Sequence, residues 1–81
     1  MKVTVKKKSN PVPVVIGTEY IKLESALKLA NAVGSGGEAK ALIQDGQATV
    51  NGEVCTMRGK KLYPGDQFSF MGIDYIITIH S

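Results

Sequence analysis

The 81-residue sequence has one cysteine, one histidine and no tryptophan, and these scarcities limit its chemistry. A single thiol, Cys55, forms no internal disulfide and no zinc cluster, so we expect a reducing, cytoplasmic location. Neither Cys55 nor His80 has the base and orienting group that a nucleophilic site needs. The carboxylates are scattered, without the spacing of metal ligands. The residues therefore predict a protein that is not an enzyme and carries no cofactor or metal.

Long apolar runs and strong charge imbalance are also lacking. No segment approaches the roughly 18 apolar residues of a membrane span, and no signal peptide is visible. With 43% hydrophobic and 21% charged residues, the chain has a globular composition and room for one modest core. The net charge of +3 favours polyanionic partners only mildly. We expect a monomer that does not enter membranes.

Residues 1–17 are predicted to be an N-terminal extension, partly strand or disordered, ahead of a domain at residues 18–81. The extension has a short alternating piece, a lysine run at residues 6–8, and two prolines. Pro11 and Pro13 favour an extended or edge segment, because proline cannot donate to a sheet ladder.

Two short helices are predicted next. Apolar residues recur at spacings of three and four up to Gly34, where we expect the first helix to end, and Glu24 and Lys28 are placed to form an i,i+4 pair. Ser35 and Glu38 have the spacing of a capping box at the start of a second helix. With so short a joint, the helices are expected to fold back on each other.

The remainder predicts strands. Asn51-Gly52 indicates a hairpin that sets Val50 opposite Glu53 and Thr49 opposite Val54. A basic loop at residues 57–66 ends in a Pro-Gly turn, and two alternating apolar runs flank a break at Gly72. The predicted fold class is α+β, with two short antiparallel helices packed on a small, mostly antiparallel sheet.

The stretch GSGGEAK, residues 34–40, is a candidate anion site. The first N–H groups of a helix have no partner inside it, and the helix dipole places partial positive charge there. Glycines would let a bulky anion approach. Alternatively, the cap uses two amides and the glycines serve only the turn. The candidate residues are Ser35, Gly36, Gly37, Lys40 and Gln44.

Arg58, Lys60 and Lys61 form a second candidate, three cations within four residues. Alone they are typical of a solvated loop. Beside the GSGGEAK amides, they would complete a cationic strip suited to a phosphate backbone. Tyr63 is the only aromatic residue near this loop, so base stacking on a sheet is not indicated.

The order of these parts resembles the S-four domain, the RNA-binding domain named for the fourth protein of the small ribosomal subunit. The resemblance covers about residues 21–70: a leucine-striped helix, a turn with Ser and Glu-Ala-Lys, Leu-Ile, a Val-Asn-Gly hairpin and Pro-Gly-Asp. The Gly-Gly turn and Arg-Gly-Lys-Lys are most similar to small stand-alone bacterial members (YaaA/YbcJ-like).

The resemblance implies the alpha-L type of RNA-binding motif and, as partner, structured RNA, often ribosomal RNA or a ribosomal particle. By position, Lys40 matches the basic residue after Glu-Ala, and Ser35 and Gly36 occupy the turn that faces RNA. The cationic segment ahead of Pro-Gly-Asp is matched by Arg58, Lys60 and Lys61. Gly36 stands where the family frequently has an arginine.

Two other functions remain open. The sheet or a helix face could dock a protein partner, with the basic loop only solvating the domain. A β-grasp carrier is also suggested by Pro-Gly-Asp ahead of a terminal hairpin, but such carriers end in Gly-Gly, whereas this sequence ends Thr-Ile-His-Ser.

Overall fold

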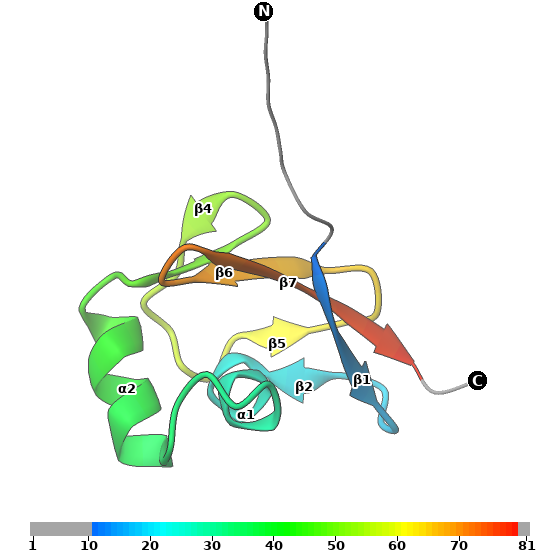
Figure 1. Ribbon diagram of the computed structural model, residues 1–81, viewed down its shortest axis with the longest axis horizontal. Helices are drawn as coiled ribbons and strands as arrows, with labels where there is room; N and C mark the ends of the chain where they lie inside the picture. The colour runs from blue at the N-terminus through cyan, green and yellow to red at the C-terminus, as the bar shows by residue number, and fades with distance from the viewer. Residues whose placement is uncertain (1–10, 80–81) are drawn as a thin grey trace, which may run out of the picture.

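The computed structural model describes residues 11–79 and places two helices and a small strand pair on the same side of a five-stranded sheet (Figure 1). The helices are α1 (Leu23–Leu29) and α2 (Gly36–Gln44), and the strands are β1 (Val12–Ile16), β2 (Ile21–Lys22), β3 (Ala48–Val50), β4 (Glu53–Val54), β5 (Lys61–Leu62), β6 (Gln67–Phe70) and β7 (Ile73–Ile79).

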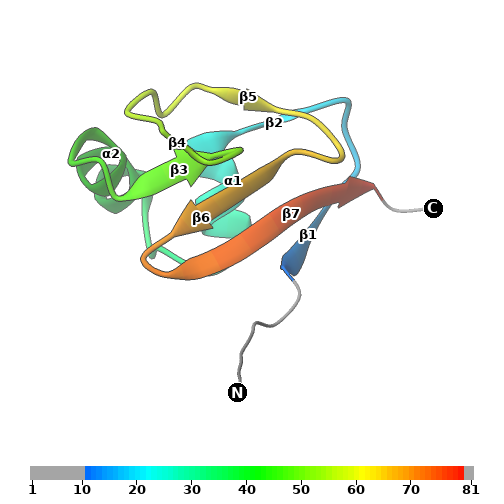
Figure 2. The same cartoon turned by 90° about the horizontal axis from the view of Figure 1, so that it is seen from above.

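The larger sheet has the strand order β1-β7-β6-β3-β4, and only β1 and β7 run parallel. The strands β2 and β5 form a separate antiparallel pair. In Figure 2 this pair lies along one flank of the molecule, and β1 and β7 lie along the other. The predicted α+β class with a mostly antiparallel sheet is confirmed.

Residues 12–16 form the edge strand β1, although they were assigned to the N-terminal extension. Val14 and Ile16 on this strand are 3% and 4% exposed, so β1 contributes to the core. Pro13 lies on the same edge strand, where a missing N–H is tolerated. The lysine run at residues 6–8 lies outside the described residues.

Two-residue turns with positive φ join the hairpins. Asn51 and Gly52 have φ values of 51° and 90°, and the pairing across them has the predicted register. A similar turn at Met71 and Gly72 joins β6 to β7. Both turns suit a right-twisted hairpin, because positive φ at both central residues matches the twist of the strands.

The first helix ends earlier than predicted, and the expected stop at Gly34 is wrong. Asn31 has φ 62°, its N–H donates to the Lys28 carbonyl at 3.0 Å, and the Ala32 N–H donates to the Leu27 carbonyl at 2.9 Å. These two hydrogen bonds are those of a Schellman ending, with asparagine in the left-handed position. The apolar spacing continued past the helix because residues of the linker also pack on the core.

The helices are consequently joined by residues 30–35, a longer joint than the sequence indicated. In Figure 1 α1 is seen nearly along its axis and α2 from the side. The second helix ends as predicted at Gly46, which has φ 84° and repeats the Schellman pattern.

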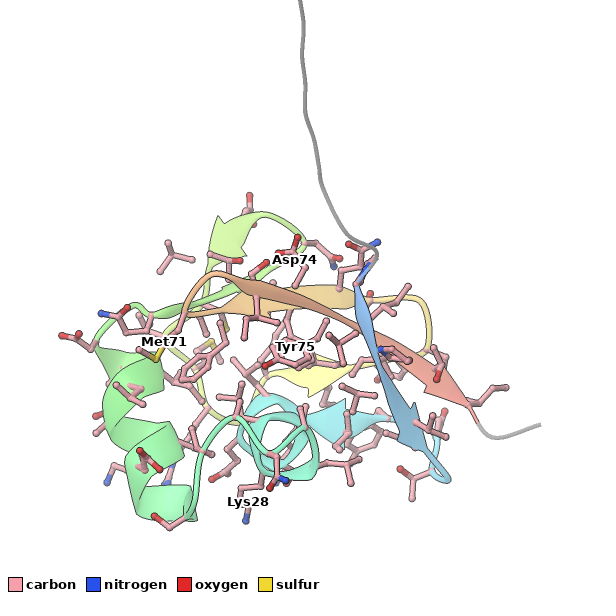
Figure 3. The ribbon with its side chains drawn as sticks, in the orientation of Figure 1. Lys28, Met71, Asp74 and Tyr75 are labelled. Atoms are coloured by element: carbon pink, nitrogen blue, oxygen red, sulfur yellow. The ribbon has the colours of Figure 1, made fainter. Side chains whose placement is uncertain are left out.

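The core lies between the larger sheet and the helices. On β7 the neighbours Asp74 and Tyr75 point to opposite faces, the tyrosine toward the helices (Figure 3). Phe68 stacks on Tyr75 with ring centroids 4.8 Å apart. All buried residues among those described are hydrophobic. The largest fully buried side chains are Phe68, Leu23, Leu27, Ile43, Leu62 and Ile77.

Candidate nucleic-acid interface

The start of α2 leaves backbone N–H groups open. Ser35 caps the helix, because its Oγ accepts from the Glu38 N–H at 3.2 Å. The Glu38 carboxylate accepts from the Gly34 N–H at 2.6 Å, one residue earlier than in a standard capping box. Among residues 11–79, the N–H groups of Gly36 and Gly37 form no hydrogen bond to another group of the protein. The cap therefore occupies two amides and leaves two that can face a ligand.

Gly36 and Gly37 are not required by the fold. Neither has a positive φ, unlike Gly46 or Gly52. A Cβ on Gly36 would have the Lys28 Nζ as its nearest neighbour at 3.9 Å, and a Cβ on Gly37 would lie 4.0 Å from the Ser35 Oγ. Both are ordinary van der Waals contacts. An alanine could therefore replace either glycine without a steric clash.

Lys28 is a cation near the start of α2 that the sequence pattern did not identify as part of the site. It was expected to pair with Glu24 along α1, but its Nζ lies beside Gly36 at the start of α2. Figure 3 shows its side chain pointing away from the sheet. We call Lys28 and the N–H groups of Gly36 and Gly37 the α2 amide site. Only the path of the 30–35 linker brings these residues together, and no local spacing encodes it.

Lys40 and Gln44 extend from this site along α2. Both are exposed, and with Gly36 they follow the i, i+4, i+8 row that marks one face of a helix. Ala39 and Ile43 lie on the buried face. Lys40 and Gln44 therefore face solvent on α2, as the sequence predicted.

The basic turn, defined as Arg58, Lys60 and Lys61, packs against the other end of α1. The Lys60 carbonyl accepts from the Leu23 N–H at 2.9 Å, and the Arg58 carbonyl accepts from the Glu24 N–H at 3.1 Å. The first amides of α1 are thereby occupied by the protein itself. All three basic side chains are exposed, and Lys60 also lines a hollow of about 330 Å³ beside the β3–β4 hairpin.

Lys61 is on a strand, not in a loop as predicted. It lies on β5 directly opposite Lys22 of β2. Its Nζ lies 4.9 Å from the centre of the Tyr20 ring, and that ring is 5.8 Å from the ring of Tyr63. Tyr63 therefore has an aromatic neighbour, which lies 43 positions away in the sequence and was missed for that reason.

The α2 amide site and the basic turn do not form one continuous strip. The basic turn caps the beginning of α1, whereas Lys28 is in its last turn. Seven helical residues separate these ends by about 10 Å at 1.5 Å per residue. The structure therefore provides two cationic areas, one at each end of α1, in place of the single strip that the sequence suggested.

In the part of the chain that the structure describes, no three His, Cys, Asp or Glu side chains gather as a metal would require. Cys55 is half-buried, and its thiol donates to the Met57 carbonyl at 3.6 Å. No helix of residues 11–79 has the length and apolar character to cross a membrane.

Comparison with known proteins identifies the fold. The family model of the S4 domain matches residues 14–78, which include every strand from within β1 to β7. A similar protein is the probable ribosome maturation protein RlbA of Bacillus subtilis (strain 168). It is 43% identical over 60 residues, and the match covers 74% of this chain and 84% of that protein. The chain belongs to the S4 domain family.

Proposed function

We propose that this protein binds structured RNA without catalysing a reaction, and that its RNA is ribosomal RNA or part of a ribosomal particle. Support comes from membership of the S4 domain family and from a relative named as a probable ribosome maturation protein. The contacts would be made mostly to phosphates, because the cations of both areas are exposed at the surface around α1.

The observation that carries the proposal is the α2 amide site. Two free N–H groups, the positive end of a helix dipole and the Lys28 ammonium converge where the adjacent glycines leave room. Such an arrangement suits a phosphate, whose oxygens accept from the amides while lysine supplies full charge. Lys40, one turn further along α2, would hold the next phosphate of the same strand.

The basic turn would supply the second contact. A phosphate bound there would be about a helix length from the first, since α1 separates the two areas by about 10 Å. A folded RNA, which brings phosphates of different strands close together, could meet both areas at once. A rigid arrangement of two cationic areas favours RNA shape over RNA sequence, as is usual for recognition through phosphates.

Salt dependence of RNA binding tests this proposal. If about four phosphates are neutralised, the logarithm of the association constant should fall with the logarithm of salt at a slope near −3 to −4. Filter binding with purified ribosomal RNA, from low to moderate salt, measures the slope. Replacing Lys28, Lys40 or Lys60 by alanine should flatten it by about one unit each.

Charge-retaining variants provide the control. Lys40→Arg and Lys60→Arg should keep the slope of the original protein, since arginine also neutralises a phosphate. Unchanged slopes in all the alanine variants would refute these contacts. No retention of RNA even at low salt would refute RNA binding itself and would favour the alternative, a module that docks a protein partner.

A further inference from the structure

The outer face of the β2–β5 pair carries two tyrosines and two lysines. Ile21 pairs with Leu62, and Lys22 pairs with Lys61. Leu62 is completely buried and Ile21 packs against the core, so these two residues face inward. Because side chains alternate along an extended chain, the flanking residues fall on the opposite face. We call this outward set the tyrosine–lysine face; it consists of Tyr20, Lys22, Lys61 and Tyr63.

The aromatic rings of this face are held in place from several directions. The Tyr20 and Tyr63 rings are 5.8 Å apart with 47° between their planes. One side of the Tyr20 ring is occupied by the Lys61 ammonium at 4.9 Å. The backbone of Tyr63 is fixed by the Pro-Gly turn: its N–H donates to the Asp66 carboxylate, and its carbonyl accepts from the Asp66 N–H, both at 2.8 Å.

Tyr63 nevertheless remains accessible, with 44% of its surface exposed. An aromatic pair that served only to stabilise the fold would gain most by burying both rings. Here the Tyr20 ring lies near both the Lys61 ammonium and the Tyr63 ring, and the Tyr63 ring presents surface to solvent. A ring that is oriented by its neighbours and open on one side suits stacking by a planar group.

The charges beside the rings point to an anionic ligand. Lys22 and Lys61 are directly opposite each other across the strand pair, and like charges in that position repel. A phosphate between or beside them would relieve the repulsion. A planar group and a phosphate together are the chemistry of a nucleotide.

We propose that the tyrosine–lysine face binds one unpaired nucleotide of the RNA, its base stacked on Tyr63 and its phosphate held by Lys22 and Lys61. This inference rests on the proposed function, since it assigns a loop or bulge nucleotide to the same RNA. The face is continuous with the basic turn through Lys61, and Lys22 directly precedes α1. Tyr20 acts as a positioning residue for both Tyr63 and Lys61.

Two RNA probes of equal charge distinguish stacking from phosphate binding. One is an RNA hairpin with a single bulged adenosine in its stem. The other is the same hairpin with an abasic residue at the bulge, which keeps the phosphate but removes the base. The original protein should bind the adenosine hairpin more tightly by roughly 5- to 150-fold, the range that one base–aromatic stack provides.

Tyr63→Leu should abolish this preference and bind both hairpins alike, whereas Tyr63→Phe should retain it, because phenylalanine keeps the ring. Circular dichroism on each variant establishes that it is folded. A measurement on the unaltered protein is independent of any variant: on addition of the adenosine hairpin, the NMR signals of the Tyr63 ring should shift upfield, and the abasic hairpin should leave them nearly unchanged.

Equal affinity of the original protein for the two hairpins would overturn the inference, as would a preference that survives in Tyr63→Leu. If the protein bound both hairpins equally well and with the expected salt slope, Tyr63 would not be a stacking site. The proposed function would still hold. Failure to bind either hairpin or ribosomal RNA at low salt would remove both.

Discussion

At the scale of single residues, Ser35 and Gly36 are neighbours that serve different purposes. Ser35 contributes to stability through a hydrogen bond within the protein, from the Glu38 N–H to its Oγ at 3.2 Å. Gly36 contributes an N–H group and an open space, neither of which the fold uses. Substitution of each residue should therefore affect one measured property and leave the other largely unchanged.

Ser35→Ala should destabilise the protein by about 1 kcal/mol, as expected when a helix loses its capping oxygen. For a domain of this size, that corresponds to a fall in Tm of about 4–8 °C. Urea denaturation followed by circular dichroism measures the change. Ser35→Asp is the control, because its carboxylate can accept from the same N–H, and it should stay close to the original stability. Equal losses in the two variants would show that the cap bond is not what stabilises α2.

Gly36→Ala and Gly37→Ala should lower RNA affinity without lowering stability. An added Cβ meets only the Lys28 Nζ at 3.9 Å or the Ser35 Oγ at 4.0 Å, and alanine favours helix more than glycine does. The same Cβ would obstruct a phosphate approaching the open amides. Filter binding and urea denaturation on the same samples separate the two effects. Full affinity in both variants would mean that the amides do not contact RNA.

At the scale of elements, Asn51 connects two turns that are distant in sequence. It occupies the β3–β4 turn with φ 51°, and its Oδ1 accepts from the Gln67 N–H at 3.1 Å. Its Nδ2 also lies 3.4 Å from the Asp66 carboxylate, beside the Pro-Gly turn. The sequence showed the first of these roles through the Asn-Gly pair, but the second depends on how the sheet brings the turns together.

Two substitutions separate these roles. Asn51→Gly should cost about 1 kcal/mol, because it tolerates positive φ and loses only the side-chain hydrogen bonds. Asn51→Ala loses the same bonds and adds the strain of a left-handed residue, so its cost should be about 2–3 kcal/mol. Urea denaturation measures both free energies of unfolding. If the two variants had equal free energies of unfolding, backbone strain at this position would not affect stability.

Helices and strands that are marked by specific turn or capping residues could be predicted from the sequence, but the residue at which a helix ends was harder to predict. The Asn51-Gly52 register followed from turn chemistry alone, and the start of α2 followed from Ser35 and Glu38. The end of α1 was misplaced because Gly34 is the more usual helix stop, whereas Asn31 adopts the left-handed conformation. Asparagine adopts the left-handed conformation at helix ends less often than glycine does. The sequence therefore favoured Gly34, and only the surrounding structure determines that Asn31 adopts this conformation.

At the scale of the whole molecule, the missed site residues share one cause. Lys28 lies beside Gly36, and Tyr20 beside Tyr63, because the chain folds back between them. Charge runs and local spacing located the α2 cap and the basic turn as separate features. The distance between them depends on how the basic turn and α2 each pack against α1, and no local sequence pattern contains that information.

Substitutions on strand β1 test whether the folded unit includes residues ahead of residue 18. Val14 is 3% exposed and its neighbour Val15 is 48% exposed, so the same substitution can be compared at a buried and an exposed position of one strand. Val14→Ala should destabilise by about 2–3 kcal/mol, since each buried CH₂ contributes about 0.8 kcal/mol and a cavity adds to the loss. Val15→Ala should cost less than about 1 kcal/mol, the span of strand propensities.

Small and equal effects from the two valines would mean that β1 is a dispensable attachment and that the domain begins at residue 18. The structure argues for the opposite result. β1 pairs along its whole length with β7, and it brings Val14 and Ile16 onto the core that also holds Leu27. A chain starting at residue 18 would lose both side chains and leave β7 as an open edge. We therefore expect that shortened chain to lack the cooperative urea transition of the full protein.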